Sequence, residues 1–306
     1  MIGPAAREAL SRTLGERVRF EVPMARLTSL RVGGPADAVA TPADRRELAA
    51  LLAICAQHRL PHQLLGAGFN TLALDGALAA VVIQLKHLRR LEERPGGSLR
   101  AEAGVSHSQV MRLCTARGLA GLEFTAGIPG TVGGWIAMNA GVPGRELVDV
   151  LIEAEVMSPT GCKLRHLPVA ALAFRYRALR GLAPGSVVVS ALLRVTPGDP
   201  ARVQAEVDRL LARRAATQPL SVPSCGSVFK NPPGDFAGRL IEASGLKGHR
   251  IGGAQISPVH ANFIANTGGA TAADVLALIH EAEQRVRRSQ GARLEREVRI
   301  VGREVA

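Results

Sequence analysis

The stretch Ala126-Gly-Ile-Pro-Gly-Thr-Val-Gly-Gly134, which runs on to Met138-Asn-Ala-Gly141, decides how this chain is interpreted. It belongs to a glycine-dense segment, Gly127–Gly144, that is too long and too apolar to be a simple linker. Glycine carries no Cβ and tolerates positive φ, so consecutive backbone N–H groups can approach a phosphate closely. The segment is therefore a candidate phosphate-binding loop, with a series of tight turns as the alternative.

A second glycine segment, Gly66-Ala67-Gly68-Phe69-Asn70-Thr71, follows the short apolar run Leu64–Leu65. Neither segment has the G-x-G-x-x-G pattern, because position 71 is Thr, and neither continues into G-K-[ST]. A Rossmann dinucleotide site and a P-loop are therefore not indicated. Two such loops in one domain suit a long ligand with a pyrophosphate in its middle.

Length and composition limit the function classes. A chain of 306 residues corresponds to about two domains, or three small ones, and 47% apolar residues is enough for a substantial core. The net charge of +12 indicates either an anionic partner or solubility alone. Aromatic residues make up only 3%, which argues against the stacking platform that single-stranded nucleic acid requires.

Cysteine usage and hydropathy indicate a cytoplasmic protein. Residues 1–20 are charged throughout and do not resemble a secretory signal, and no apolar run is long enough for a transmembrane helix. The four cysteines form no C-x-x-C pair, so we expect reduced thiols, without a zinc site or a disulfide framework. The histidines are scattered singly, and no metal site is predicted.

Periodicity indicates an α+β chain. An apolar face at i, i+3, i+4 and i+7 predicts a helix over Asp44–His58, and Ser106 and Gly118 are suited to begin and end another. Further helices are expected at 168–174 and 201–215, and from Thr271, where the sequence is typical of a capping box.

Strands are expected at 81–85, 99–102, 152–157, 187–195 and 293–301. Thr196–Pro200, with two prolines and a glycine between a strand and a helix, is the strongest candidate for a domain boundary. We expect a first subdomain at 1–80, a second at 81–198 and a C-terminal domain at 199–306.

Three polar clusters can carry chemistry. Pro223–Pro232 contains the Ser227 hydroxyl, which lacks the G-x-S-x-G elbow of a hydrolase nucleophile but can donate a proton. Phe174–Arg177 carries two guanidinium groups, which suit carboxylate or phosphate. Glu297 lies in the expected last strand, where a carboxyl group can serve as an acid. The non-catalytic alternatives are a turn residue, a solvated patch and an exposed edge.

Taken in order, these segments resemble one family, the UDP-N-acetylenolpyruvoylglucosamine reductases. The matching segments span about residues 28–302 in the family's order, and the ordered set is specific although each segment alone is weak evidence. They are Thr28–Asp37, Gly66–Asn70, Ala126–Gly141, Phe174–Arg177, Gly226–Pro232, Ala237–Gly248, His260–Phe263 and Leu294–Val298.

The resemblance implies a fold and a reaction. The fold is an FAD-binding domain of the vanillyl-alcohol-oxidase (PCMH) type in two subdomains, followed by a C-terminal α+β substrate-binding domain. NADPH reduces the FAD, and the reduced flavin then passes hydride to the enolpyruvyl ether of UDP-N-acetylglucosamine. Protonation gives UDP-N-acetylmuramate, a peptidoglycan precursor.

The resemblance also implies roles for individual residues. Ser227 corresponds to the family's proton donor, and Arg177 and Glu297 correspond to its catalytic arginine and glutamate. Substrate contacts are implied for Tyr176, Lys230 and Asn231. The implied FAD-binding residues are Gly66, Ala67, Gly68, Phe69, Asn70, Thr71, Gly127, Ile128, Pro129, Gly130, Thr131, Gly133, Gly134, Asn139 and Gly141.

Several positions depart from the family pattern. Phe69 stands where Ser is common, and Thr217 stands where Lys is frequent, so a cationic contact to the substrate phosphates is expected instead from Arg213 or Arg214. Tyr176 is the only tyrosine, which is similar to the shorter subgroup without a separate tyrosine loop. Two alternatives stay open: another FAD-dependent oxidoreductase of the same fold, and a basic nucleic-acid-binding protein.

Overall fold

The computed structural model describes residues 2–305, which form two compact units built from interleaved segments. The first unit comprises the chain up to Phe20, Ala38–Ala67 and Ala80–Arg213. The second comprises Glu21–Asp37, Gly68–Ala79 and the chain from Arg214 onward. Each unit therefore depends on chain segments that are far apart in sequence.

The main sheet of the first unit is antiparallel, with strand order β12-β11-β15-β7-β6. Its strands are β12 (Leu164–Pro168), β11 (Leu151–Met157), β15 (Val187–Arg194), β7 (Ser98–Glu102) and β6 (Leu91–Arg94). A second sheet has the order β1-β2-β5-β3, with β1 (Val18–Pro23), β2 (Pro35–Ala40), β5 (Leu78–Ile83) and β3 (His62–Leu64). Three short pairs are β8 (Leu119–Ala120) with β16 (Thr196–Pro197), β9 (Gly141–Val142) with β10 (Arg145–Glu146), and β13 (Ala173–Arg175) with β14 (Ala178–Arg180).

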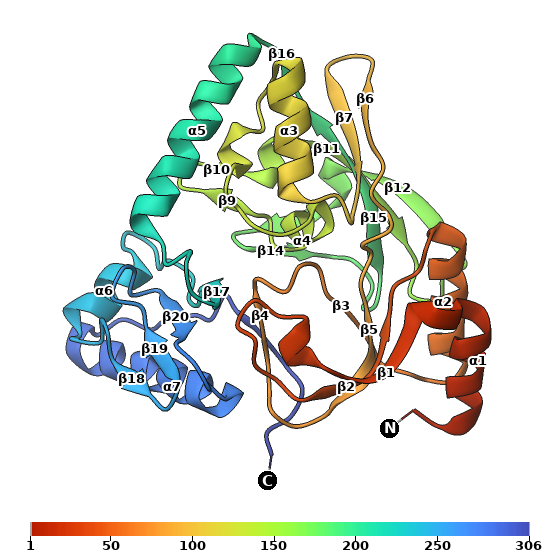
Figure 1. Ribbon diagram of the computed structural model, residues 1–306. Helices are drawn as coiled ribbons and strands as arrows, with labels where there is room; N and C mark the ends of the chain where they lie inside the picture. The colour runs from red at the N-terminus through yellow and green to blue at the C-terminus, as the bar shows by residue number, and fades with distance from the viewer. Residues whose placement is uncertain (1, 306) are drawn as a thin grey trace. The chain divides into compact units, whose positions relative to one another are not determined.

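Helices cover these sheets because each buries one apolar stripe. They are α1 (Pro4–Leu14), α2 (Arg45–Gln57), α3 (His107–Arg117), α4 (Val132–Ala137) and α5 (Pro200–Thr217), the last of which ends in the second unit. Helices α3 and α4 lie over one face of the five-stranded sheet (Figure 1) and share a core with its strands, in which Trp135 is almost fully buried. Leu48, Leu51, Leu52 and Cys55 of α2 pack with α1 in a separate core.

The second unit has its own sheet and helices. Its sheet has the order β17-β20-β19-β18, formed by β17 (Ser224–Ser227), β20 (Phe263–Asn266), β19 (Ala254–Ile256) and β18 (Arg250–Ile251). Helices α6 (Ala237–Ala243) and α7 (Ala272–Gln290) pack in the same core. The last strand, β21 (Arg299–Val301), pairs in parallel with β4 (Thr71–Ala73).

The capping predictions for Ser106, Gly118 and Thr271 are confirmed, and the helix expected over Asp44–His58 forms with an N-cap that was not predicted. The carboxylate of Asp44 accepts the N–H groups of Arg46 and Glu47 at the start of α2. Ser106 and Gln109 form a capping box at the start of α3, and Gly118 ends that helix in the left-handed conformation. Thr271 and Asp274 form the expected capping box of α7.

Two element predictions are wrong. Residues 168–174 form only a 3-10 turn, Val169–Ala171, because the next residues pair with β14 and leave too few for a helix. The strand expected over 293–301 is limited to Arg299–Val301. Glu297 therefore lies just before β21, in a segment whose backbone forms hydrogen bonds with the backbone of residues 228–230.

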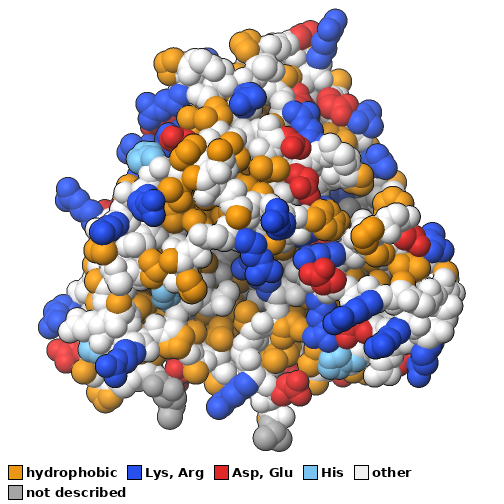
Figure 2. Space-filling model, turned by 180° about the vertical axis from the view of Figure 1, so that it is seen from behind, with side chains coloured by type: hydrophobic (Ala, Val, Ile, Leu, Met, Phe, Trp, Pro, Cys, Tyr) orange, Lys and Arg blue, Asp and Glu red, His pale blue; other side chains and the backbone are white. Residues whose placement is uncertain are grey.

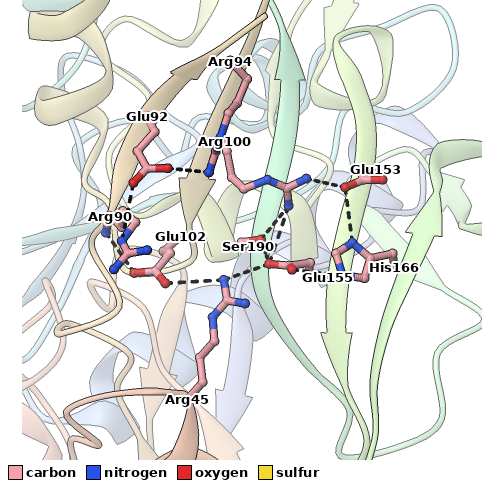
Figure 3. Close-up of polar contacts among 10 residues, drawn as sticks. All are labelled: Arg45, Arg90, Glu92, Arg94, Arg100, Glu102, Glu153, Glu155, His166 and Ser190. Atoms are coloured by element: carbon pink, nitrogen blue, oxygen red, sulfur yellow. Dashed lines mark hydrogen bonds and ion pairs between the residues drawn. The ribbon is translucent and has the colours of Figure 1, made fainter.

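A polar network crosses the five-stranded sheet, with the buried side chains of Glu155 and Ser190 at its centre (Figure 3). Glu155 on β11 accepts hydrogen bonds from Ser190 on β15 and from Arg45 on α2. Arg100 on β7 pairs with Glu153 on β11. These contacts tie α2 to three strands of the sheet within the first unit.

The basic charge is dispersed. Figure 2 shows Lys and Arg side chains spread over the visible face, with Asp and Glu among them. This distribution indicates that much of the +12 net charge serves the surface. Among the described residues, every helix is too short or too polar to cross a lipid bilayer.

Candidate active site

The two glycine loops adjoin within the first unit. A Cβ built on Gly66 would lie 3.1 Å from Oγ1 of Thr131. Thr131 is the N-cap of α4, and its hydroxyl accepts the N–H of Gly134 at 3.5 Å. The structure thus brings the start of the 66–71 loop next to the 127–134 loop, as a single ligand spanning both would require.

The 127–134 loop is fixed by its backbone. The carbonyl of Gly130 accepts the N–H of His107, and the N–H of Gly133 donates to the carbonyl of Ala103 at 2.9 Å. Gly130 has φ of +119° and open space where a side chain would be, so the backbone stays uncovered there. An uncovered, rigid backbone is what a phosphate group needs for close approach.

The end of the first loop belongs to the second unit and touches the serine segment. A Cβ built on Gly226 would lie 3.5 Å from the carbonyl oxygen of Phe69. The side-chain amide of Asn70 donates to the backbone carbonyl of Glu297 at 3.1 Å, and the backbone carbonyl of Asn70 accepts the N–H of Arg299. Loop residues Gly68–Thr71 are therefore packed against both segments that carry predicted catalytic residues of this unit.

Ser227 and Glu297 lie on neighbouring segments. Ser227 ends β17, after a bulge and after Gly226, whose φ is +72°. The next residue, Val228, accepts the N–H of Glu297 at 2.8 Å through its carbonyl oxygen. Both side chains are partly buried, so each retains access to a ligand.

Lys230 and Asn231 follow on the same segment. The ammonium of Lys230 pairs with the Glu295 carboxylate at 2.5 Å, and its backbone N–H donates to the carbonyl of Glu295. The side-chain oxygen of Asn231 accepts the N–H of Ala237 at 3.0 Å, at the start of α6. Asn231 therefore holds the serine segment to a helix as well as being a predicted substrate contact.

Arg177 belongs to the first unit, where the backbone holds it in a fixed orientation. Its guanidinium donates to the carbonyl of Gly141 at 2.9 Å and to the carbonyl of Asn139 at 3.4 Å, and it lies 3.4 Å from the Glu146 carboxylate. The Tyr176 ring, which is 42% exposed, lies 4.7 Å from the guanidinium carbon. Asn139 and Gly141, predicted as FAD-binding residues, thus contact Arg177.

Asn139 is buried and bonds several of the segments that surround Arg177. It is 1% exposed with φ of +42°, and its side-chain amide donates to Glu146 and to the carbonyl of Arg175. Its side-chain oxygen accepts the N–H of Val148. The positive φ of both Asn139 and Arg177 (+56°) is backbone strain of the kind that is found at functional sites.

Two further groups have shifted pKa values. Burial raises the pKa of the Cys225 thiol to about 12, with the Glu297 charge contributing, so this thiol stays protonated and unreactive. Burial lowers the pKa of Arg214, and its Nε is the one buried side-chain nitrogen or oxygen among residues 2–305 without a hydrogen-bond partner. A buried guanidinium nitrogen in this state suits an anionic ligand.

Sequence reasoning assigned no role to Asn262, although the His260–Phe263 segment was singled out. Asn262 is 3% exposed and bonds the backbone of Phe229 twice, two residues after Ser227. A polar amide between apolar residues is the only sequence signal of this contact. Its partner is 33 residues away, so local pattern could not identify it.

Comparisons with known proteins define the class first. A family model described as an FAD binding domain matches residues 36–166. The fold alone is shared with the structure of Physcomitrella patens BBE-like 1, with a TM-score of 0.50 and 16% identity over 63% of this chain and 44% of that one. The chain is an FAD-binding protein of the vanillyl-alcohol-oxidase (PCMH) type, with the α+β composition that was expected.

The comparisons then define the family. A model described as the UDP-N-acetylenolpyruvoylglucosamine reductase C-terminal domain matches residues 218–301. The reductase of Geobacter metallireducens is 48% identical over 95% of both chains, and that of Anaeromyxobacter dehalogenans is 47% identical over 96% of this chain and 88% of its own. The crystal structure of the Thermus caldophilus reductase has a TM-score of 0.80 and 34% identity, over 93% of this chain and 100% of that one. The chain belongs to the UDP-N-acetylenolpyruvoylglucosamine reductase family.

The loops fit the FAD that the family binds. At Gly68 any Cβ would overlap the carbonyl oxygen of Leu27, and the φ of +72° favours glycine independently. At Gly133 a Cβ would lie 2.9 Å from Cβ of Ala103. Both loops therefore need glycine for their path, and a backbone without side chains is suited to close approach of a phosphate.

Proposed function

We propose that this chain catalyses the NADPH-dependent, FAD-mediated reduction of UDP-N-acetylglucosamine enolpyruvate to UDP-N-acetylmuramate. One observation carries the proposal beyond family membership. The segment with Ser227 is bonded directly to the segment with Glu297 and is packed against the end of the first glycine loop. The proposed proton donor Ser227, the carboxyl group of Glu297 and part of the proposed cofactor loop thus belong to one folded unit.

The proposed chemistry follows from the residue types. When bound, FAD supplies the hydride that it receives from NADPH. Addition to the vinyl carbon leaves negative charge conjugated to the substrate carboxylate, which Arg177 and a protonated Glu297 are proposed to stabilise. Ser227 then donates the proton that completes the lactyl ether.

The surroundings of Arg177 support its proposed role. Two backbone carbonyls and Glu146 orient the guanidinium before any substrate arrives, so little reorganisation is needed when charge develops. The side chain of Arg177 is only 14% exposed, and reduced contact with water strengthens its effect on a nearby anion.

The C-terminal domain is proposed to bind the UDP-sugar, as its family match over 218–301 supports. Lys230, Asn231 and Tyr176 are the proposed substrate contacts. Arg214 lies one helical turn before Thr217 on α5, and its unpartnered Nε supports a contact to the diphosphate. We also propose a cytoplasmic location, which the four free cysteines support.

The proposal is tested by anaerobic mixing in two steps. The FAD-loaded protein is first mixed with NADPH, and loss of the flavin absorbance at about 450 nm reports reduction. UDP-N-acetylglucosamine enolpyruvate is then added, and we expect the flavin absorbance to return with formation of UDP-N-acetylmuramate. UDP-N-acetylglucosamine, which lacks the vinyl group, is the matched control and should leave the flavin reduced.

The other candidate functions give different results in the same experiment. Another oxidoreductase of this fold would be reduced by its own donor but would not be reoxidised by the enolpyruvyl ether. A nucleic-acid-binding protein would show strongly salt-dependent affinity for RNA or DNA and no flavin signal. Either result would contradict the proposed reaction and support the corresponding alternative function.

A further inference from the structure

Asn262 connects the serine segment to strand β20. Its side-chain oxygen accepts the N–H of Phe229 at 2.9 Å, and its side-chain nitrogen donates to the carbonyl of the same residue at 2.8 Å. Its backbone carbonyl accepts the N–H of Val228, also at 2.9 Å. Three bonds from one residue thus fix the backbone of the two residues that follow Ser227, Val228 and Phe229.

These bonds replace the strand-to-strand hydrogen bonds beyond the end of the β17–β20 pairing. Strand β17 pairs with β20 up to Ser227, opposite Phe263, and the regular ladder does not continue. The side-chain amide of Asn262 offers one hydrogen-bond acceptor and one donor to the backbone of Phe229, as a neighbouring strand would. Phe229 is 2% exposed, so water cannot replace these partners.

The opposite side of the same backbone holds Glu297. The carbonyl of Val228 accepts the N–H of Glu297 at 2.8 Å and that of Val298 at 3.2 Å. The segment Val228–Phe229 therefore lies between Asn262 on one side and the Glu297 segment on the other. Any displacement of this segment moves Ser227 relative to Glu297.

Asn262 is itself held in place. Its backbone N–H donates to Nδ1 of His260 at 3.2 Å. His260 is partly buried and packs edge-on against Phe263 at 5.0 Å between ring centroids. Burial lowers the pKa of His260, which keeps the ring neutral and leaves Nδ1 able to accept this bond.

We propose that Asn262 is a positioning residue of the reductase reaction, which fixes the Ser227 hydroxyl for proton donation and sets its distance from Glu297. The inference rests on the proposed function, because it requires Ser227 to be the proton donor. Asn262 touches neither substrate nor cofactor in this assignment and acts through the peptide groups of Val228 and Phe229.

The first test compares the two half-reactions. In Asn262→Ala we expect NADPH to reduce the flavin as in the wild type, and the enolpyruvyl ether to reoxidise it about 10- to 100-fold more slowly, since small displacements of reacting groups have effects of this size. The KM for substrate should change little. The solvent deuterium isotope effect on reoxidation should increase, because proton transfer becomes more rate-limiting.

The second test is a double-mutant cycle with Ser227→Ala. If Asn262 acts through the Ser227 hydroxyl, removing Asn262 from Ser227→Ala should slow reoxidation by less than about twofold further. Equal losses in both backgrounds would overturn the positioning role. Asn262→Asp, which keeps the acceptor for Phe229 N–H and loses the donor, provides the same comparison if the alanine variant does not fold.

Asn266→Ala, at the end of the strand β20 that follows Asn262, is the matched control. The Asn266 side chain bonds Leu30, Gly268 and Ala270 and none of residues 227–230. It should lower thermal stability without a selective loss of reoxidation, and an equal selective loss would contradict our inference. A wild-type protein that fails to turn over the enolpyruvyl ether overturns the proposed function itself, whereas normal turnover with additive variants overturns only the role of Asn262.

Discussion

The carboxylate of Glu155 lies 2.8 Å from the guanidinium of Arg45, although Glu155 is only 6% exposed. Arg45 opens α2 and Glu155 lies on β11, so this ion pair joins a helix to the main sheet of the first unit. Ser190 and Arg100 approach the same carboxylate, as Figure 3 shows. Several donors around a buried carboxylate favour its charged form over the neutral one.

Glu155→Gln is expected to destabilise the first unit by about 2 kcal/mol, because it removes a buried charged acceptor of hydrogen bonds. The loss stays moderate because Arg45 and Arg100 are partly exposed and keep Glu102 and Glu153 as partners. Urea unfolding near neutral pH measures the loss. Glu93→Gln, on the exposed part of β6, is the control and should be close to wild type. Equal stability of Glu155→Gln and wild type would show that the Arg45–Glu155 ion pair makes no net contribution to the free energy of unfolding.

Acid should weaken the protein through the same network. Burial acts to raise the pKa of Glu155, but hydrogen bonds from Ser190 and Arg45 and the charges of Arg45 and Arg100 hold it below its ordinary value of 4.5. A lowered folded-state pKa gives stability that is present above that ordinary value and is lost as the pH falls through the lowered one. We expect a smaller acid-induced loss in Glu155→Gln than in wild type, measured by urea unfolding at stepwise lower pH.

Gly68→Ala should impair FAD binding selectively. The new Cβ would overlap the carbonyl of Leu27 and displace the loop. Gly96→Ala is a closely matched control, because Gly96 also has positive φ, at +77°, but has open space around a Cβ. Both variants lose about 1 kcal/mol from backbone strain, while only Gly68→Ala should bind FAD more weakly in a flavin fluorescence titration. Equal affinities would remove the loop from the cofactor site.

Ser227→Ala should separate the two half-reactions. Flavin reduction by NADPH should persist, whereas reoxidation by the enolpyruvyl ether should fall by about 100- to 10,000-fold, the range of general acid catalysis. Stopped-flow absorbance measures both. Ser224→Ala, at the start of the same strand, is the control and should retain reoxidation. A fully active Ser227→Ala would assign the proton to another group.

The four thiols should react very unequally. Burial raises the pKa of Cys55 to about 11 and those of Cys114 and Cys225 to about 12. Cys162 is exposed, and hydrogen bonds from the Thr160 and Ser158 hydroxyls lower its pKa. A thiol reagent should therefore label one cysteine of the native protein, and Cys162→Ser should abolish that labelling. Rapid labelling of a second site would show local opening of a core.

Sequence patterns predicted the elements whose causes are local. Asp44, Ser106 and Thr271 cap helices through neighbours three residues or fewer away, so capping and periodicity were sufficient. The segment 293–301 alternates like a strand, but only three of its residues find a ladder partner, β4, more than 200 residues earlier. A local pattern carries no information about such a partner.

The candidate site likewise combines residues that sequence motifs identify with contacts that only the tertiary structure shows. Ser227, Arg177 and Glu297 could be assigned because their motifs resemble those of a family, while the contacts that orient them are distant in sequence. Asn139 holds Arg177 from 38 residues away, and Asn262 holds Phe229 from 33. Residue type and spacing identify chemically capable groups, whereas orientation depends on tertiary contacts.

The parallel pairing of β21 with β4 limits how this protein can be divided by evolution or by engineering. The family-matched region 218–301 ends in a strand whose only ladder partner in the described chain is Thr71–Ala73, and its core includes Leu72 and Leu74. A fragment beginning near residue 218 would expose this strand edge and part of its core, and should aggregate when expressed alone. Residues Gly68–Thr71, which are proposed to contact FAD, are therefore structurally tied to the segment that carries Glu297. Under the proposed assignment, the cofactor-binding and substrate-binding residues of this unit cannot be exchanged as independent modules.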